Sequence, residues 1–155
     1  MQLCDNKSVG VIIKNENNEV VLLERARFPL GLAPPAGHID EHGGYIEAAI
    51  AEVFEEVGIR LVSGDLKEVL HDIYIPNICR RLGGSHHTWR VYETTIASQK
   101  LIPDPDETNG AGWYSMGEVR ALSAKVSGRA EDNNRVDMPI LEHVWCKLLT
   151  ESGVL

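Results

Sequence analysis

The sequence predicts one domain of layered helices and strands, with either an α/β or an α+β fold. The chain has 155 residues, which is the size of one ordinary domain. Hydrophobic residues make up 43% of it and charged residues 25%, close to the average for globular proteins, so disorder, collagen and coiled coils are disfavoured. The expected strands outnumber the expected helices but alternate with them along the chain, which favours packed layers.

Two strands and a loop are expected at the start of the chain. Residues 8–14 and 20–24 are apolar, β-branched runs, and four turn-forming residues, 15–18, separate them. This pattern predicts a β-hairpin. The segment 27–37 contains three prolines and two glycines, so it is expected to be an irregular loop.

The next segment predicts an amphipathic helix over residues 45–57, and Gly58 is expected to end it. Its apolar residues recur at spacings of three and four, and they are Ile46, Ala49, Ile50, Val53, Phe54 and Val57. The later expected elements are strands at 66–75, 88–96 and 113–114 and helices at 116–122 and 140–149, the last of them behind a polar stretch, 123–137.

Charge and cysteine usage limit the classes of partner. The formal net charge is −8, so the surface repels phosphate backbones, nucleic acid is not an expected partner, and an anionic substrate needs metal ions or local arginines. Cys4, Cys79 and Cys146 form no C-x-x-C pair, which favours free thiols over disulfides or a zinc knuckle, and Cys79 is expected to be unreactive. Without a long apolar run or a leader-like start, the chain is expected to be cytoplasmic and to have no membrane partner.

Three carboxylates are expected on one face of the predicted helix. At about 100° per residue, Glu52, Glu55 and Glu56 point the same way. Such a face is either a solvated acidic surface or a site for a hard divalent ion, which takes carboxylate oxygens as ligands. The loop before the helix favours the second interpretation, since Gly37 lets main-chain carbonyls approach an ion closely.

The segment from Gly37 to Ile59 resembles the signature of the Nudix hydrolases, G-x5-E-x7-R-E-U-x-E-E-x-G-U, where U is a bulky apolar residue. All positions are in register except two: Gly43 stands where the family has glutamate, and Ala51 where it has arginine. The resemblance extends over residues 8–122 and implies an α/β/α sandwich with a mixed central β-sheet, as a single domain over residues 1–155. Because the two lost side chains usually lie near each other in the family, their joint absence is compatible with the fold.

The resemblance also implies an activity, the metal-dependent hydrolysis of a phosphoanhydride in a nucleoside diphosphate-linked substrate by metal-activated water. The substrates left open are nucleoside triphosphates, nucleotide sugars, ADP-ribose and dinucleoside polyphosphates. Mg²⁺ or Mn²⁺ is the implied ion, with Gly37, Glu52, Glu55 and Glu56 as its ligands. Glu55, Glu56 and Glu107 are the implied catalytic residues.

Two substitutions in the signature raise an alternative function, a catalytically impaired Nudix domain that senses a nucleotide or a metal. Asp40 and Glu41 are candidates to replace the missing glutamate. The expected partner is a small nucleotide-type molecule, and a homodimer is left open.

Four residues are candidates for binding the substrate. Arg25, Arg27 and Arg81 have guanidinium groups that suit phosphate, and Phe28 is able to stack on a base. Each has an ordinary alternative: a surface charge for the arginines, and core packing for the aromatic ring. His86 and His87 are adjacent on an expected strand end and point to opposite faces, so they are not expected to share a metal.

Overall fold

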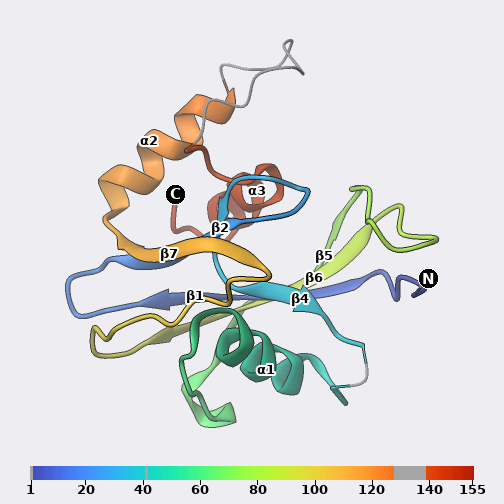
Figure 1. The fold of residues 1–155 in the computed structure, drawn as a ribbon, viewed down its shortest axis with the longest axis horizontal. Coiled ribbons are helices and arrows are strands. Elements are labelled where there is room, and N and C mark those ends of the chain that lie inside the picture. Colours follow the sequence, from blue (N-terminus) through green and yellow to red (C-terminus); the bar gives the residue numbers. More distant parts are fainter. Residues whose placement is uncertain (1, 41, 128–138) are drawn as a thin grey trace.

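A mixed β-sheet forms the centre of the molecule (Figure 1). The structure is a computed structural model that describes residues 2–40, 42–127 and 139–155. The sheet follows the order β3-β2-β1-β6-β5, while β4 pairs with β1 and β7 with β2. β1 and β6 are parallel, and the other named strand pairs are antiparallel. The strands are β1 (Lys7–Lys14), β2 (Val20–Arg25), β3 (Leu32–Ala33), β4 (Ala36–His38), β5 (Lys67–Ile75), β6 (His87–Thr95) and β7 (Thr108–Tyr114).

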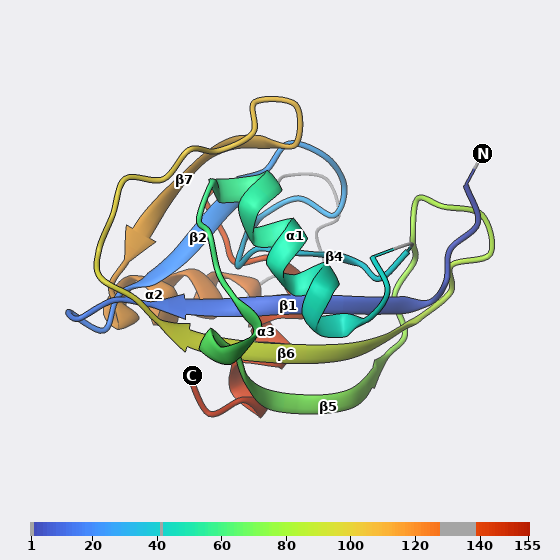
Figure 2. The ribbon, with the colours of Figure 1, turned by 90° about the horizontal axis from the view of Figure 1, so that it is seen from below.

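Helices cover both faces of this sheet. α1 (Tyr45–Val57) packs on one face, whereas α2 (Met116–Ser127) and α3 (His143–Glu151) lie on the other (Figures 1 and 2). The central strand β1 serves both layers, because Val9 and Val11 belong to the hydrophobic core under α1 and Ile12 to the core under α2 and α3. Alternating side chains of a strand point to opposite faces, and the α/β/α sandwich is thereby confirmed.

The elements with strong local patterns match their predictions. β1 and β2 form the expected hairpin, and the helix spans residues 45–57 as predicted. Gly58 ends it in the left-handed conformation, with φ of 73°, and its N–H donates to the Phe54 carbonyl. The ring of Phe54 is the exception to the predicted apolar face, since it is exposed and lies under the Arg60 guanidinium, 4.3 Å from its centroid.

Several expected bounds were wrong. The predicted loop 27–37 contains β3 and the first two residues of β4, β7 begins at Thr108, α2 continues to Ser127, and α3 begins at His143. β4 forms because its backbone pairs with β1, a contact that prolines nearby in the sequence do not prevent. β7 forms by pairing with β2 although glycines interrupt its apolar pattern. Of the polar stretch 123–137, the part from residue 128 onward lies outside the described residues.

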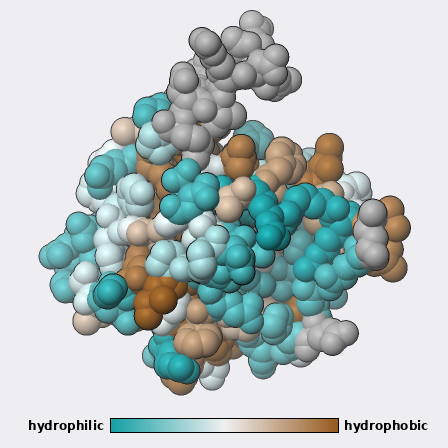
Figure 3. All heavy atoms as spheres, viewed as in Figure 1, coloured by the Kyte–Doolittle hydropathy of each residue, from teal (hydrophilic) through white to brown (hydrophobic). Residues whose placement is uncertain are grey.

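The sheet divides beside β1, and this division positions the site. At one end, Lys14 of β1 pairs with Val20 of β2, whereas at the other end Ser8 and Gly10 pair with β4. After β4, a short loop leads the chain into α1. The face in Figure 3 is largely hydrophilic, with hydrophobic residues in small scattered groups. Within the described ranges, no helix has the length and apolar character needed to cross a bilayer.

Candidate active site

A cleft of about 440 Å³ opens where α1, β4 and the loops after β2 and β5 meet. Glu52, Glu55 and Glu56 line it from the helix, and Gly37 lines it from β4. The predicted grouping of the three glutamates with the glycine is thus present in the structure. The cleft also contains side chains from distant parts of the chain, among them Asp104 and Glu107 before β7.

Glu52 and Glu56 lie at the inner end of this cleft. A methyl group on Gly37 would overlap the Glu52 carboxylate, so only glycine permits this approach. The Ala36 N–H donates to Glu56 Oε2 at 2.9 Å. Burial raises the pKa of Glu56 to about 8, and repulsion from Glu52 adds to the shift. Burial, followed by repulsion from Glu55, raises the pKa of Glu52 to about 7. Partly buried carboxyl groups that resist ionisation are suited to a bound cation, which would favour their charged forms.

Glu55 and Glu107 approach the same cleft from its open side. Glu55 is exposed on α1. Glu107 follows the turn at Asp104 and accepts from Arg27 Nη1 at 3.4 Å, with both side chains about half exposed. The two carboxylates are therefore accessible to water and to a substrate in the cleft.

Two arginines bring positive charge to the cleft. Arg25 lies at the end of β2, and its Nε is buried without a hydrogen-bond partner among the described residues. Arg81 pairs with Asp40 through both guanidinium nitrogens, with Nη2 at 2.9 Å from Oδ2, and this partner lowers the pKa of Asp40. Phe28 also lines the cleft and is 58% exposed, so it is free to contact a ligand. Arg27 does not line the cleft and instead pairs with Glu107.

Gly43 and Ala51 provide no polar group at their positions. Gly43 has φ of 95°, and a methyl group added there would meet nothing within 4 Å. Of the two proposed replacements for the missing glutamate, Asp40 is engaged by Arg81, and Glu41 lies outside the described residues. The Asp40–Arg81 ion pair connects the loop before α1 to the β5–β6 loop.

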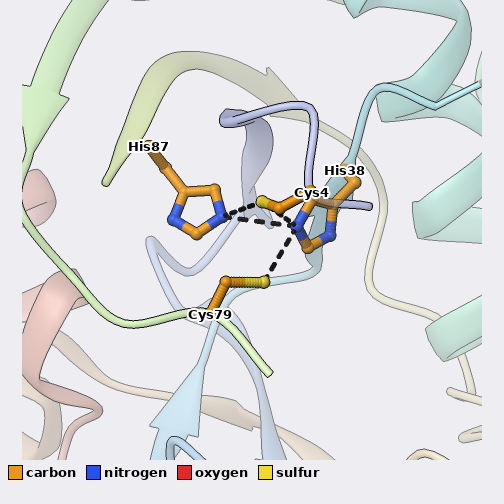
Figure 4. A group of neighbouring side chains, drawn as sticks. All are labelled: Cys4, His38, Cys79 and His87. Carbon is orange, nitrogen blue, oxygen red and sulfur yellow. Dashed lines mark hydrogen bonds between the residues drawn. The ribbon is translucent and has the colours of Figure 1, made fainter. Parts of the chain in front are cut away.

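A second cluster of functional side chains was missed by the sequence analysis. Cys4, His38, Cys79 and His87 bring one ligand-type atom each to within 4.8 Å of the others (Figure 4). Burial lowers the pKa of both histidines, that of His87 to about 4. Cys79, which was expected to be unreactive, thus lies close to a second thiol and two imidazoles. His86 and His87 separate as expected, since His86 stacks on Tyr74 outside the cluster.

A mixed sheet between helical layers, with a glutamate-bearing helix set against a glycine of the preceding strand, defines the Nudix class of fold. The sequence pattern of the NUDIX domain matches residues 5–133, and the chain belongs to this family.

The chain is similar to m7GpppN-mRNA hydrolase NUDT17 of Danio rerio, with 27% identity over 137 residues, 79% of this chain and 46% of that protein. Its identity to NUDT17 of Xenopus laevis is 30% over 117 residues, covering 68% and 40%. The chain thus spans less than half the length of these curated relatives. The crystal structure of the MutT protein from Methanosarcina mazei Go1 superposes with a TM-score of 0.68 at 16% identity, over 99% of this chain and 96% of that one, and supports the fold.

Proposed function

We propose that this chain is a divalent-metal-dependent Nudix hydrolase that cleaves a phosphoanhydride bond in a nucleoside diphosphate-linked substrate. The observation that carries the proposal is the pair of carboxyl groups of Glu52 and Glu56, partly buried beside Gly37 at the inner end of a cleft. Neither carboxylate forms an ion pair with any residue that the structure describes, and taking unpaired carboxylates out of water is costly for the fold. An ion-binding role is a physical reason for this chain to keep them.

The donor set fits a hard cation. Glu52, Glu56 and the main chain at Gly37 present oxygen ligands, as Mg²⁺ and Mn²⁺ prefer. A divalent ion bound there supplies neutralisation of the pyrophosphate oxygens and a lower pKa for water. The protein's own contribution is to hold these carboxylates at the inner end, with the Ala36 N–H fixing the orientation of Glu56.

The remaining cleft residues are assigned by their position. Arg25 and Arg81 line the cleft, so their guanidinium groups are candidates to bind the phosphates of a substrate and locally offset the net charge of −8. Phe28 is exposed enough to stack on a base. Glu55 and Glu107 are both accessible, and either is a candidate to accept the proton of the attacking water.

The relatives bear on the class of substrate. Two of them are named as hydrolases of m7GpppN-mRNA, in which a polyphosphate joins two nucleosides. Their names favour a substrate with a phosphoanhydride bridge between two groups, and they add a cap dinucleotide to the substrates considered. The acidic surface favours a small molecule over a long RNA, because few surface cations are available for a phosphate backbone.

A sensor without turnover is the second candidate function. It is favoured by Gly43 and Ala51, which lack the glutamate and arginine of the family signature. Such a domain keeps nucleotide and metal binding and lacks hydrolysis. It is distinguished from the enzyme by turnover alone, since both functions require the same cleft.

The test is a substrate panel assayed with Mg²⁺ and with Mn²⁺. It contains a nucleoside triphosphate, a nucleotide sugar, ADP-ribose, a dinucleoside tetraphosphate and the cap dinucleotide, and the released phosphates are identified by chromatography and by ¹⁸O incorporation from labelled water. We expect turnover on at least one bridged substrate and a loss of about 10²-fold or more in Glu56→Gln. Glu47→Gln is the matched control, since Glu47 is exposed on the same helix and outside the cleft.

Two outcomes separate the alternatives. Binding of a panel nucleotide without turnover would identify the sensor. Turnover that survives Glu56→Gln undiminished would show that the signature glutamates are not the metal ligands and would refute the proposed mechanism.

A further inference from the structure

Two sulfur and two nitrogen atoms converge on one point at the wall of the cleft, which His38, Cys79 and His87 line (Figure 4). His38 Nε2 lies 3.5 Å from Cys4 Sγ, 3.4 Å from Cys79 Sγ and 3.3 Å from His87 Nε2. His87 Nε2 lies 3.3 Å from Cys4 Sγ. Cys4 and Cys79 are free thiols, so a disulfide does not account for the approach of their sulfur atoms. A disulfide would also leave unexplained why both imidazoles point toward these sulfur atoms.

These separations match a tetrahedral metal site. Zinc lies about 2.3 Å from thiolate sulfur and about 2.0–2.1 Å from imidazole nitrogen. In a tetrahedron with these bond lengths, neighbouring ligand atoms are roughly 3.3–3.8 Å apart. Four of the six separations among these atoms are 3.3 to 3.5 Å and fall in this range, and the other two are no longer than 4.8 Å. The ligand set of two cysteines and two histidines is a common one for structural zinc.

The sheet topology brings the four residues together from distant positions. Cys4 precedes β1, His38 ends β4 and His87 begins β6, and both of these strands pair with the same end of β1. Cys79 arrives from the β5–β6 loop, which is fixed to the N-terminal segment by the hydrogen bond from Cys4 N–H to the Leu82 carbonyl at 2.9 Å. The N-terminal segment and this loop lie side by side in both ribbon views (Figures 1 and 2).

Surrounding groups orient the ligand atoms. The Asn77 side-chain oxygen lies 2.8 Å from His87 Nδ1, so this nitrogen carries the proton and Nε2 presents its lone pair to the cluster. Backbone N–H groups two residues further on, at Asn6 and Arg81, donate to Cys4 Sγ and Cys79 Sγ at 3.4 and 3.3 Å. Such donors stabilise negative charge on sulfur, as in thiolate ligands.

Close backbone approach is also required at this point. A methyl group on Gly84 would lie 3.0 Å from Cys4 Sγ and still closer to the Cys79 side chain. Only glycine therefore lets the β5–β6 loop pass the two thiols at this distance. Such a close approach is expected where one bound ligand holds the β5–β6 loop and the N-terminal segment together.

We propose that Cys4, His38, Cys79 and His87 bind one zinc ion that fastens the N-terminal segment and the β5–β6 loop to β4. Binding replaces the two thiol protons, which pass to solvent, and two thiolates with two neutral imidazoles then balance the 2+ charge of the ion. With four protein ligands the site has no open position, so its role is structural. The bound ion would hold Arg81 and the loop before α1 in place, because Arg81 follows Cys79 by two residues and pairs with Asp40 of that loop.

The first experiment measures metal content on the whole chain. Protein purified under reducing conditions is dialysed against millimolar Mg²⁺, which competes with zinc for the oxygen ligands of the cleft. The zinc content is then measured by inductively coupled plasma mass spectrometry. We expect one zinc per chain, and its loss in Cys4→Ser and in Cys79→Ser. Cys146→Ser is the matched control, since Cys146 lies on α3, outside the cluster, and should keep the ion.

Cobalt substitution keeps the proposal testable if a cysteine variant fails to fold. Co²⁺ added to metal-depleted wild type should produce thiolate-to-cobalt charge-transfer bands and the visible spectrum of a tetrahedral ion. Carboxylates of the cleft cannot produce the thiolate bands. Asn77→Ala, which leaves all four ligands in place, should weaken zinc binding by about 10- to 100-fold in a chelator competition.

Three results would overturn the proposal. They are zinc content that is unaffected by Cys4→Ser, an octahedral cobalt spectrum without thiolate bands, and, in protein purified without reductant, a Cys4–Cys79 disulfide with no bound zinc, detected as the loss of two hydrogens by intact mass. None of these measurements depends on hydrolysis, so their failure is distinguishable from the failure of the proposed enzymatic function.

Discussion

Removing the charge of Glu56 should stabilise the metal-free protein and change how its stability depends on pH. The pKa of Glu56 rises from 4.5 to about 8 on folding because the carboxyl group is buried. A carboxyl group with a raised pKa holds its proton in the folded state at pH values where the unfolded chain has released it. Its contribution therefore destabilises the fold progressively as pH increases from about 4.5 to about 8.

The magnitude follows from this shift. At about 1.4 kcal/mol per pKa unit, the burial of the Glu56 carboxylate costs roughly 5 kcal/mol above pH 8. Glutamine has nearly the same shape, carries no charge and keeps an oxygen that accepts from the Ala36 N–H. In Glu56→Gln, the free energy of unfolding should therefore exceed that of wild type by a few kcal/mol at pH 8.5 and equal it near pH 4.5.

The assay is urea denaturation from pH 4.5 to 8.5 after dialysis against Mg²⁺-free buffer. Chelators are left out, so that a tightly held thiolate-bound ion is not removed. Added Mg²⁺ should then stabilise wild type, by about 2.7 kcal/mol at a hundred times its dissociation constant, and leave Glu56→Gln unchanged. Glu47→Gln should follow wild type throughout. Parallel pH profiles for wild type and Glu56→Gln would refute the reasoning.

Three further outcomes follow from the cleft. Gly37→Ala should abolish hydrolysis and weaken Mg²⁺ binding measured by calorimetry, because its methyl group would overlap Glu52; unchanged binding would contradict this. Gly43→Glu restores the signature residue but should lower the free energy of unfolding by roughly 1–2 kcal/mol, since φ is 95° there, with Gly64→Ala as a control. At Mg²⁺ concentrations below saturation, hydrolysis should rise with pH, because protons on Glu52 and Glu56 compete with the ion; an optimum near pH 5 would contradict the assignment.

Local periodicity was sufficient to predict the helix and its carboxylates. The spacing of Val53 and Val57 fixes the buried face of α1, and this leaves Glu52, Glu55 and Glu56 on the cleft side. Gly37 was also predictable, because its distance from these glutamates along the chain is part of the family signature.

Backbone pairing between distant segments could not be predicted in the same way. β4 has only three residues and depends on hydrogen bonds to β1, which require no particular side chains. β7 contains two glycines and forms because β2 supplies its partner. The Cys/His cluster was missed for the same reason, since His38 and His87 meet only after β4 and β6 pair with β1. No local spacing relates them.

The strand β4 contributes to both sites of different chemistry, and residues of both line the same cleft. Successive residues of a strand point to opposite faces: a side chain on Gly37 would point into Glu52, while His38 points into the sulfur and nitrogen cluster. Hard oxygen ligands suit Mg²⁺, and soft thiolates with imidazoles suit zinc. Because one strand supplies both sites, a zinc ion that fixes His38 also fixes the main chain at Gly37. Loss of that ion is therefore expected to weaken Mg²⁺ binding at the neighbouring carboxylates, and loss of Mg²⁺ is expected to weaken zinc binding by the same factor, because the coupling between two binding sites is reciprocal.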